Sequence, residues 1–273
     1  MSKFDHLIEN GYSFNMGEYF SEGWNLFKKE AGSFIGFGIL MIIMIFILAF
    51  IPGISLLSGL FTNVLTAGIF LFCRGIKNGN QEFGQFFNGF NHFLQIFLHW
   101  LVLGLFSIPA FILIFTVLIP FEMLPELLGG YSDPEYIAEE FAYSMQDRVG
   151  VFIGTAFLLF IFYMYLYISY SFVIPLIVDE GMQFWDAMET SRKIVGKQFF
   201  SYFGMYIVIG IASIIGVTVT CFFGYFVVAP VTGCIVFAAY DLILEPKKGN
   251  DITSQLDEFG QKDDDINTES QDQ

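Results

Sequence analysis

The residues of this sequence that could do chemistry are four ionisable side chains at the edges of long apolar segments, namely Arg74, Asp179, Glu180 and Asp241. As a group they could bind lipid headgroups or a partner protein. Charges at such positions more often mark where a helix leaves the bilayer, because a charge in mid-membrane is costly. We favour that structural explanation.

Three basic residues are our candidates for contacts with anionic lipid headgroups: Arg74, Arg192 and Lys193. Lysine and arginine near a membrane surface attract anionic lipids, although we favour simple anchoring of the helices as their role. The sequence has no GxSxG elbow, P-loop, HExxH motif or glycine-rich dinucleotide turn, each of which would place a nucleophile, phosphate or metal. We therefore expect no catalytic, cofactor-binding or metal-binding residue.

A second group of polar residues lies inside the apolar segments. Asn63 stands near the middle of one of them, and since an amide in lipid needs a partner, we expect it to face another helix and hold the bundle together. Tyr163, Tyr167 and Tyr170 lie close together in a later segment. Each hydroxyl also needs a partner, so some of them should point into the bundle, where they pack or line a polar cavity.

The elements that position these residues are membrane helices. Hydrophobic residues make up 55% of the 273 residues and charged residues only 14%, against about a quarter charged in soluble domains. Apolar runs of this length suffice to cross the hydrocarbon. The sequence predicts an all-α membrane protein with six transmembrane helices in three hairpins, each preceded by an amphipathic interfacial helix. The expected spans are 33–51, 54–73, 96–119, 149–178, 200–220 and 222–244.

The three interfacial helices are predicted over 17–31, 81–95 and 184–199 from apolar residues at helical spacing. We expect their bulky aromatic stripes to be the faces turned to the membrane. The segments Phe20–Phe27 and Phe86–Phe93 share the frame F-x-x-G-aromatic-N-x-F, which indicates an internal repeat. The predicted apolar stripes consist of Phe20, Trp24, Phe27 and Ala31, then Phe83, Phe87, Phe90 and Leu94, then Phe184, Met188, Val195 and Phe199.

Other local signals fill in the domain organisation. Residues 1–16 are predicted to be a loose lead-in, 17–246 the membrane domain, and 247–273 a disordered acidic tail. Within the acidic loop before the fourth span, Asp133 and Pro134 are a good helix start, and we expect a short amphipathic helix there.

Two glycine pairs at small-xxx-small spacing are candidates for close helix approach. They are Gly32 with Gly36 and Gly150 with Gly154. His99 and Trp100 are interpreted as interfacial anchors, and the three cysteines as small packing residues.

Orientation follows from the basic residues. With six spans, eleven of the twelve lysines and arginines fall on the side of both termini and only Arg148 on the other. This bias predicts a multi-pass protein of the bacterial inner membrane with both termini in the cytoplasm.

One stretch resembles a known family. The segment 170–180, followed by Trp185-Asp186-Ala187-Met188 and Ser191-Arg192-Lys193, is similar to a loose superfamily of uncharacterised bacterial six-helix inner-membrane proteins. These are related to the membrane domain of glycerophosphodiester phosphodiesterases. The resemblance implies a helical bundle with surface helices and no assigned activity, and the chain has no room for the phosphodiesterase barrel.

For function, two hypotheses remain. The first, which we favour, is a non-enzymatic integral membrane protein with a structural, lipid-contacting or partner-binding role. Membrane lipids are its expected partners, a membrane protein is a possible one, and nucleic acid is not. The alternative is a transporter or exporter of a small apolar or zwitterionic substrate. In that case Asn63 and the tyrosines would line a cavity, and Pro109, Pro175 and Pro230 would provide hinges.

Overall fold

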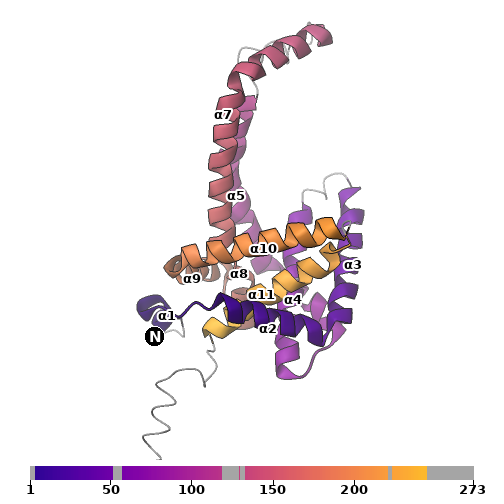
Figure 1. The fold of residues 1–273 in the computed structure, drawn as a ribbon, viewed down its shortest axis with the longest axis vertical. Helices are drawn as coiled ribbons and strands as arrows, with labels where there is room; N and C mark the ends of the chain where they lie inside the picture. Colours follow the sequence, from indigo (N-terminus) through magenta and orange to yellow (C-terminus); the bar gives the residue numbers. More distant parts are fainter. Residues whose placement is uncertain (1–3, 52–56, 119–128, 130–132, 221–222, 245–273) are drawn as a thin grey trace, which may run out of the picture.

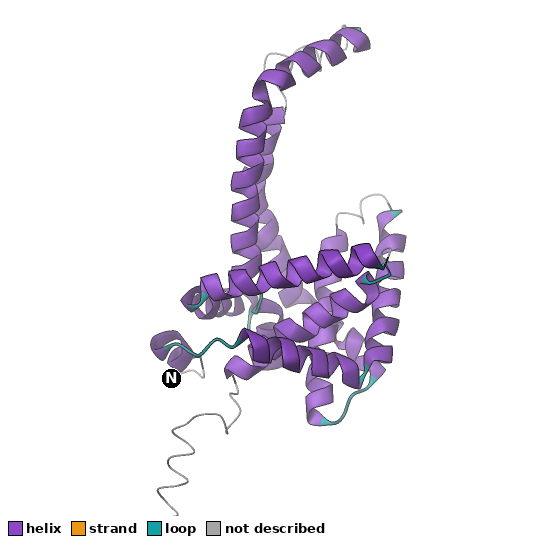
Figure 2. Cartoon of the chain, in the orientation of Figure 1, coloured by secondary structure: helices purple, strands orange, loops and turns teal. Residues whose placement is uncertain are grey.

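The computed structural model describes residues 4–51, 57–118, 129, 133–220 and 223–244. Every regular element among them is a helix (Figure 2), and six helical segments are long and apolar enough to cross a membrane. This confirms the predicted all-α membrane class. In chain order the helices are α1 (Asp5–Asn10), α2 (Met16–Lys29), α3 (Ala31–Ala49), α4 (Ser58–Asn78), η2 (Phe83–His92), α5 (Phe93–Leu118), α7 (Pro134–Ser169), α8 (Val173–Glu180), α9 (Phe184–Lys197), α10 (Phe199–Val219) and α11 (Tyr225–Leu244).

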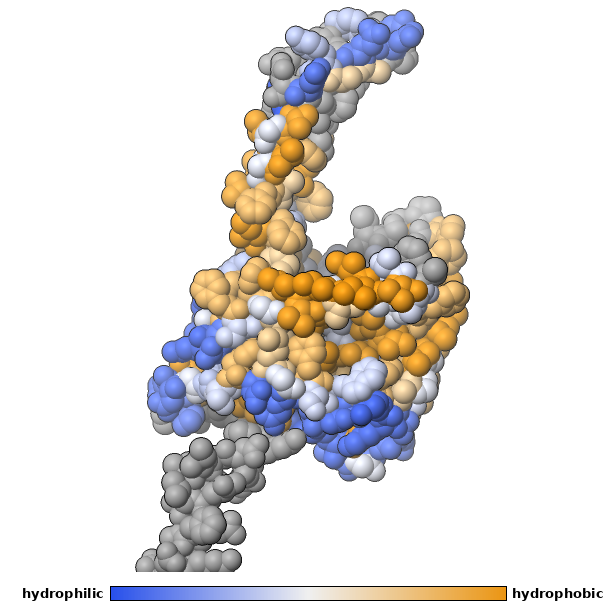
Figure 3. All heavy atoms as spheres, viewed as in Figure 1, coloured by the Kyte–Doolittle hydropathy of each residue, from blue (hydrophilic) through white to orange (hydrophobic). Residues whose placement is uncertain are grey.

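The membrane helices pack as the expected antiparallel pairs, α3 with α4, α5 with α7, and α10 with α11. Figure 1 shows α5 and α7 running side by side away from the remaining helices, while α10 crosses the body at a steep angle to them. Hydrophilic residues gather at the lower edge of the body and at the far end of α7, with apolar surface between (Figure 3). That distribution matches a bilayer, in which apolar side chains face lipid at mid-depth.

The fourth membrane segment differs from its prediction in two ways. The short helix expected before it is continuous with the span, so that α7 is one helix of 36 residues. It begins as predicted, because the Asp133 side chain accepts a hydrogen bond from the Glu135 N–H. The segment is then interrupted between Ser169 and Val173 before α8 continues to Gly181, whose φ of 66° ends the helix in the left-handed region. Glycine adopts that conformation without strain.

The helices expected at the membrane surface each pack on the second half of a hairpin. α2 lies along α11 and α9 along α8 (Figure 1). η2 lies along α4. Because the first of these contacts joins the start of the chain to its last helix, the three units close on one another. Packing against several neighbours buries more apolar area than any single hairpin could bury alone.

The buried face of α2, η2 and α9 is centred on a small residue. A Cβ on Gly23 would come within 2.6 Å of the Ile235 backbone, and a Cβ on Gly89 would overlap the Val64 carbonyl. In α9 the fully buried Ala187 takes the corresponding position, because it follows Phe184 by three residues as Gly23 follows Phe20. These short side chains let one backbone approach another closely.

The stripes predicted to face the membrane divide between the surface and the interior of the bundle. Trp24, Phe83 and Phe90 are exposed, which leaves them available to the membrane, whereas Phe86, outside the predicted stripe, is fully buried and stacks between Phe37 and Phe72, with ring centroids 4.2 and 4.1 Å away. In α9 the stripe residues Met188 and Val195 are buried in the bundle.

The expected loose lead-in is packed. Residues 5–10 form α1, and the Tyr12 hydroxyl donates to the Ile194 carbonyl at 3.0 Å and lies 3.3 Å from the Tyr202 hydroxyl. Burial raises the pKa of Tyr12, because the ionised phenolate is disfavoured away from water. These contacts fix the N-terminal segment to α9 and α10.

One further prediction is wrong and others lie outside the described residues. Apart from the backbone of the same helix, no described atom lies within 4 Å of a Cβ added at Gly32, Gly36, Gly150 or Gly154, so these pairs do not mark close helix contacts. Cys73 and Cys234 are buried, in keeping with the packing role predicted for them, and their thiols meet at 3.6 Å between α4 and α11. The turn at 52–53, the loop residues 120–128 and the tail from 247 onward fall outside the described part of the chain.

Candidate functional site

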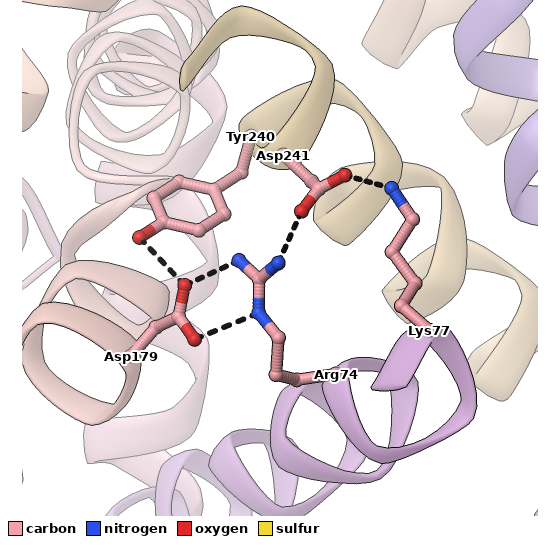
Figure 4. Close-up of polar contacts among 5 residues, drawn as sticks. All are labelled: Arg74, Lys77, Asp179, Tyr240 and Asp241. Carbon is pink, nitrogen blue, oxygen red and sulfur yellow. Dashed lines mark hydrogen bonds and ion pairs between the residues drawn. The ribbon is translucent and has the colours of Figure 1, made fainter. Parts of the chain in front are cut away.

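Charged residues from three hairpins meet at one end of the bundle and form a cluster that we call the ion cluster: Arg74, Lys77, Asp179, Tyr240 and Asp241 (Figure 4). Arg74 donates to Asp179 through Nε and Nη2 at 2.8 and 2.5 Å, and to Asp241 through Nη1 at 2.5 Å. Lys77 donates to the second oxygen of Asp241, and the Tyr240 hydroxyl donates to Asp179 at 3.2 Å. A bidentate pair of this kind is both strong and geometrically specific.

The ion cluster joins parts of the chain that are far apart in sequence. Arg74 lies on α4, while its partners Asp179 on α8 and Asp241 on α11 are 105 and 167 residues away. The side chain of Asp241 is only 2% exposed and that of Arg74 22%. The nearly buried charge of Asp241 is tolerated because Arg74 and Lys77 pair with it. The predicted contact of Arg74 with lipid headgroups stays a prediction, and the geometry adds a role in holding α4, α8 and α11 together.

Arg192 and Lys193, the other candidates for headgroup contacts, lie on the outer face of α9. Both pair with Glu189, at 2.9 and 3.2 Å, and all three side chains are more than 40% exposed. Hydrogen bonds from Arg192 lower the pKa of Glu189. Exposed pairs of this kind contribute little to stability, so both basic side chains can exchange Glu189 for another anion at small cost.

A cavity of about 800 Å³ opens between the α5–α7 pair and the other helices; we call it the bundle cavity. Figure 3 shows the hollow where α5 and α7 leave the body. The structure brings all four polar residues proposed for such a cavity to its wall, namely Asn63, Tyr163, Tyr167 and Tyr170. The three tyrosines share one helix face because they are spaced by four and three residues.

Asn63 lies in the cavity wall but does not bridge two helices. Its amide nitrogen donates to the Gly59 carbonyl 3.0 Å away, one turn earlier in α4. Within the described residues, the predicted hydrogen bond to a neighbouring helix is therefore replaced by one inside the same helix. This pattern is common for short polar side chains in helices, and it leaves the rest of the amide available at the cavity.

Several cavity residues were not recognised in the sequence. His99 and Trp100, interpreted as interfacial anchors, both line the bundle cavity, and His99 is 3% exposed. Ser171 and Tyr206 also contribute to the wall. A lone histidine beside a tryptophan has no distinctive spacing, so only the packing of α5 against α7 and α8 places it here.

The cavity and the ion cluster are neighbours. Phe70, Ile174 and Val236 line the cavity, and each precedes a charged member of the cluster by four or five residues on α4, α8 and α11. The cluster thus lies about one helical turn beyond the cavity wall. Among the described residues, no group of three or more His, Cys, Asp or Glu side chains is placed to hold a metal ion.

A family model described as the membrane domain of glycerophosphoryl diester phosphodiesterase matches residues 69–245. The chain belongs to this family. The match covers the second half of α4 and everything through α11, including Arg74, Asp179 and Asp241, and it confirms the resemblance recognised around residues 170–193. No curated protein and no solved structure matches the chain.

Proposed function

We propose that this protein is a non-enzymatic, lipid-contacting integral membrane protein whose bundle cavity binds an amphipathic molecule from the bilayer. The observation that supports the proposal is the cavity itself, which at about 800 Å³ lies within the range of ligand sites, roughly 300–1,000 Å³. Its wall is mostly apolar, as in Phe37 and Phe111, with polar groups such as Asn63 and Tyr167 on the same surface. An acyl chain and a polar headgroup would each find a matching region.

The test is to purify the protein in native lipid nanodiscs and identify the lipids that remain bound. Leu103 lines the cavity, whereas Leu105 on the same helix lies outside it and is 55% exposed. Leu103→Trp should displace the bound lipid by filling the space, and Leu105→Trp is the matched control that should retain it. An unchanged lipid complement in the Leu103 variant would refute the proposal, and a stoichiometric protein partner would favour a scaffold role.

Transport is the second candidate. Pro109 and Pro230 lie inside α5 and α11, two helices that border the cavity, and proline removes a backbone hydrogen bond and permits bending. In proteoliposomes, a fluorescent lipid should then move between the two leaflets faster with the wild type than with Leu103→Trp. The rate is measured from the loss of fluorescence after addition of dithionite, which reduces only the fluorophores in the outer leaflet. Binding without accelerated movement would leave the lipid-binding proposal and exclude lipid transfer.

For location, we propose the bacterial inner membrane with both termini in the cytoplasm, which the distribution of basic residues supports. A fusion of alkaline phosphatase after residue 273 should be inactive in this orientation. An active fusion would show that the C-terminus lies outside the cytoplasm and would contradict the proposed orientation.

A further inference from the structure

Two buried polar atoms beside the bundle cavity make no hydrogen bond of normal geometry to a described residue, Nδ1 of His99 and Oγ of Ser171, although the Tyr206 hydroxyl lies near enough to Ser171 to interact with it. Both residues line the cavity. His99 comes from α5, and Ser171 from the interruption between α7 and α8, so two elements deliver them to the same space. Buried polar atoms without partners are rare, and each one calls for an explanation, of which a ligand is one.

The interruption that presents Ser171 is a built feature. Ser191 on α9 donates to the Ser169 carbonyl at 2.8 Å and accepts from the Phe172 N–H at 3.2 Å, so that it satisfies the backbone where α7 ends. Non-helical backbone at membrane depth is tolerated where it is buried in protein or lines a cavity. The position of Ser171 is thus fixed by its neighbours, and its hydroxyl lies in the cavity wall beside Tyr206.

The charge of the cavity wall limits what can bind there. Among the described residues that line it, none is Asp, Glu, Lys or Arg. The charges of the ion cluster are paired with one another, and Arg192, which acts on Tyr170 in the wall, pairs with Glu189 on the outer face of α9. A phosphate or carboxylate inside the cavity would lose its hydration without a charged residue in the wall to pair with, which is strongly unfavourable. The wall therefore selects uncharged molecules.

We propose that His99 and Ser171 form a hydroxyl subsite for an uncharged lipid alcohol of the diacylglycerol type. This inference rests on the proposed function and names its ligand class. A hydroxyl both donates and accepts, so one group can satisfy an imidazole nitrogen and a serine oxygen together. The acyl chains would lie against the apolar part of the wall, which includes Phe37 and Leu103.

Trp100, which lines the same cavity, provides the measurement. The chain has three tryptophans, so Trp24→Phe with Trp185→Phe leaves Trp100 as the reporter. In nanodiscs, a small fraction of dibrominated diacylglycerol should quench Trp100 more than the same fraction of dibrominated phosphatidylcholine. The third probe is a dibrominated diacylglycerol whose hydroxyl is acetylated, and it should quench less than the free alcohol. The acetylated probe isolates the contribution of the hydroxyl group.

Ser171→Ala and His99→Leu should each weaken diacylglycerol binding by about fivefold to tenfold, the range expected for one lost hydrogen bond. Ser201→Ala, outside the cavity, is the control, and Ser171→Ala suffices if His99→Leu does not fold. Undiminished binding in the folded variants, equal quenching by the acetylated probe, or a preference for phosphatidylcholine would overturn the subsite alone. If all three probes quench Trp100 equally, and only as much as their average concentration in the bilayer predicts, the proposed function would be overturned as well.

Discussion

Replacing Arg74 by methionine is the sharpest test of how the three hairpins are held together. The substitution keeps the apolar stem of the side chain but removes the guanidinium, whose carbon lies 5.1 Å from the centroid of the Phe237 ring in a cation–π contact. It removes three hydrogen bonds to two carboxylates. Asp179 then keeps only the neutral Tyr240 hydroxyl among the cluster residues, and Asp241 keeps only Lys77.

The size of the effect follows from burial. Removing one partner of a buried ion pair typically costs about 3–5 kcal/mol, because the remaining charge stays desolvated. Asp241 is 2% exposed, but Arg74 and Asp179 are 22% and 17% exposed, so water relieves part of the cost. We therefore expect Arg74→Met to lower the free energy of unfolding by about 3 kcal/mol, at the lower end of that range.

The assay is unfolding in detergent by titration with SDS, followed by tryptophan fluorescence. Arg192→Met removes an arginine from an exposed pair with Glu189 and should change the free energy by less than about 0.5 kcal/mol. Adding Asp179→Asn to Arg74→Met neutralises the carboxylate that has lost its cation, while Asp241 keeps Lys77, and should recover about half of the loss. Equal unfolding midpoints for the Arg74 and Arg192 variants would refute a structural role of the ion cluster.

Two further predictions concern packing and the cavity. Gly23→Ala places a Cβ against the Ile235 backbone and should destabilise the protein by about 1–3 kcal/mol through overpacking. Gly36→Ala, with open space around it, should instead stabilise the protein by up to about 1 kcal/mol. Thermal unfolding of the two variants tests this, and equal shifts of their unfolding temperatures would contradict the close contact between α2 and α11. Asn63→Leu should lower the free energy of unfolding by less than about 1 kcal/mol in the SDS titration, because its amide bonds within α4 and one such bond contributes about that much. A larger loss would restore the interhelical role first predicted for Asn63.

Much of the secondary structure can be predicted from the sequence because its signals are local. The capping side chain of Asp133 lies where expected, since capping depends on a few neighbouring residues. Spacing along one helix likewise predicts that Tyr163, Tyr167 and Tyr170 share a face. That this face borders a cavity depends on where α5 and α10 pack.

The closest contacts of the surface helices could not be predicted from the apolar pattern. Trp24 and Phe90 carry the strongest apolar signal, yet Gly23 and Gly89 make the closest contacts. Glycine contributes almost nothing to a hydrophobic pattern. Its importance arises only when a second backbone lies against it, and that requires the complete packing.

By itself the sequence determined the membrane class, the number of spans and most helix ends, because the length of an apolar run and the residues at its ends act within one helix. Only the tertiary structure decided that Arg74 pairs with Asp179 and Asp241 and that His99 lines a cavity. Each charge, taken alone, resembles an ordinary helix end at the membrane surface. Their pairing is a property of three hairpins meeting in space, and no periodicity along a single segment records it.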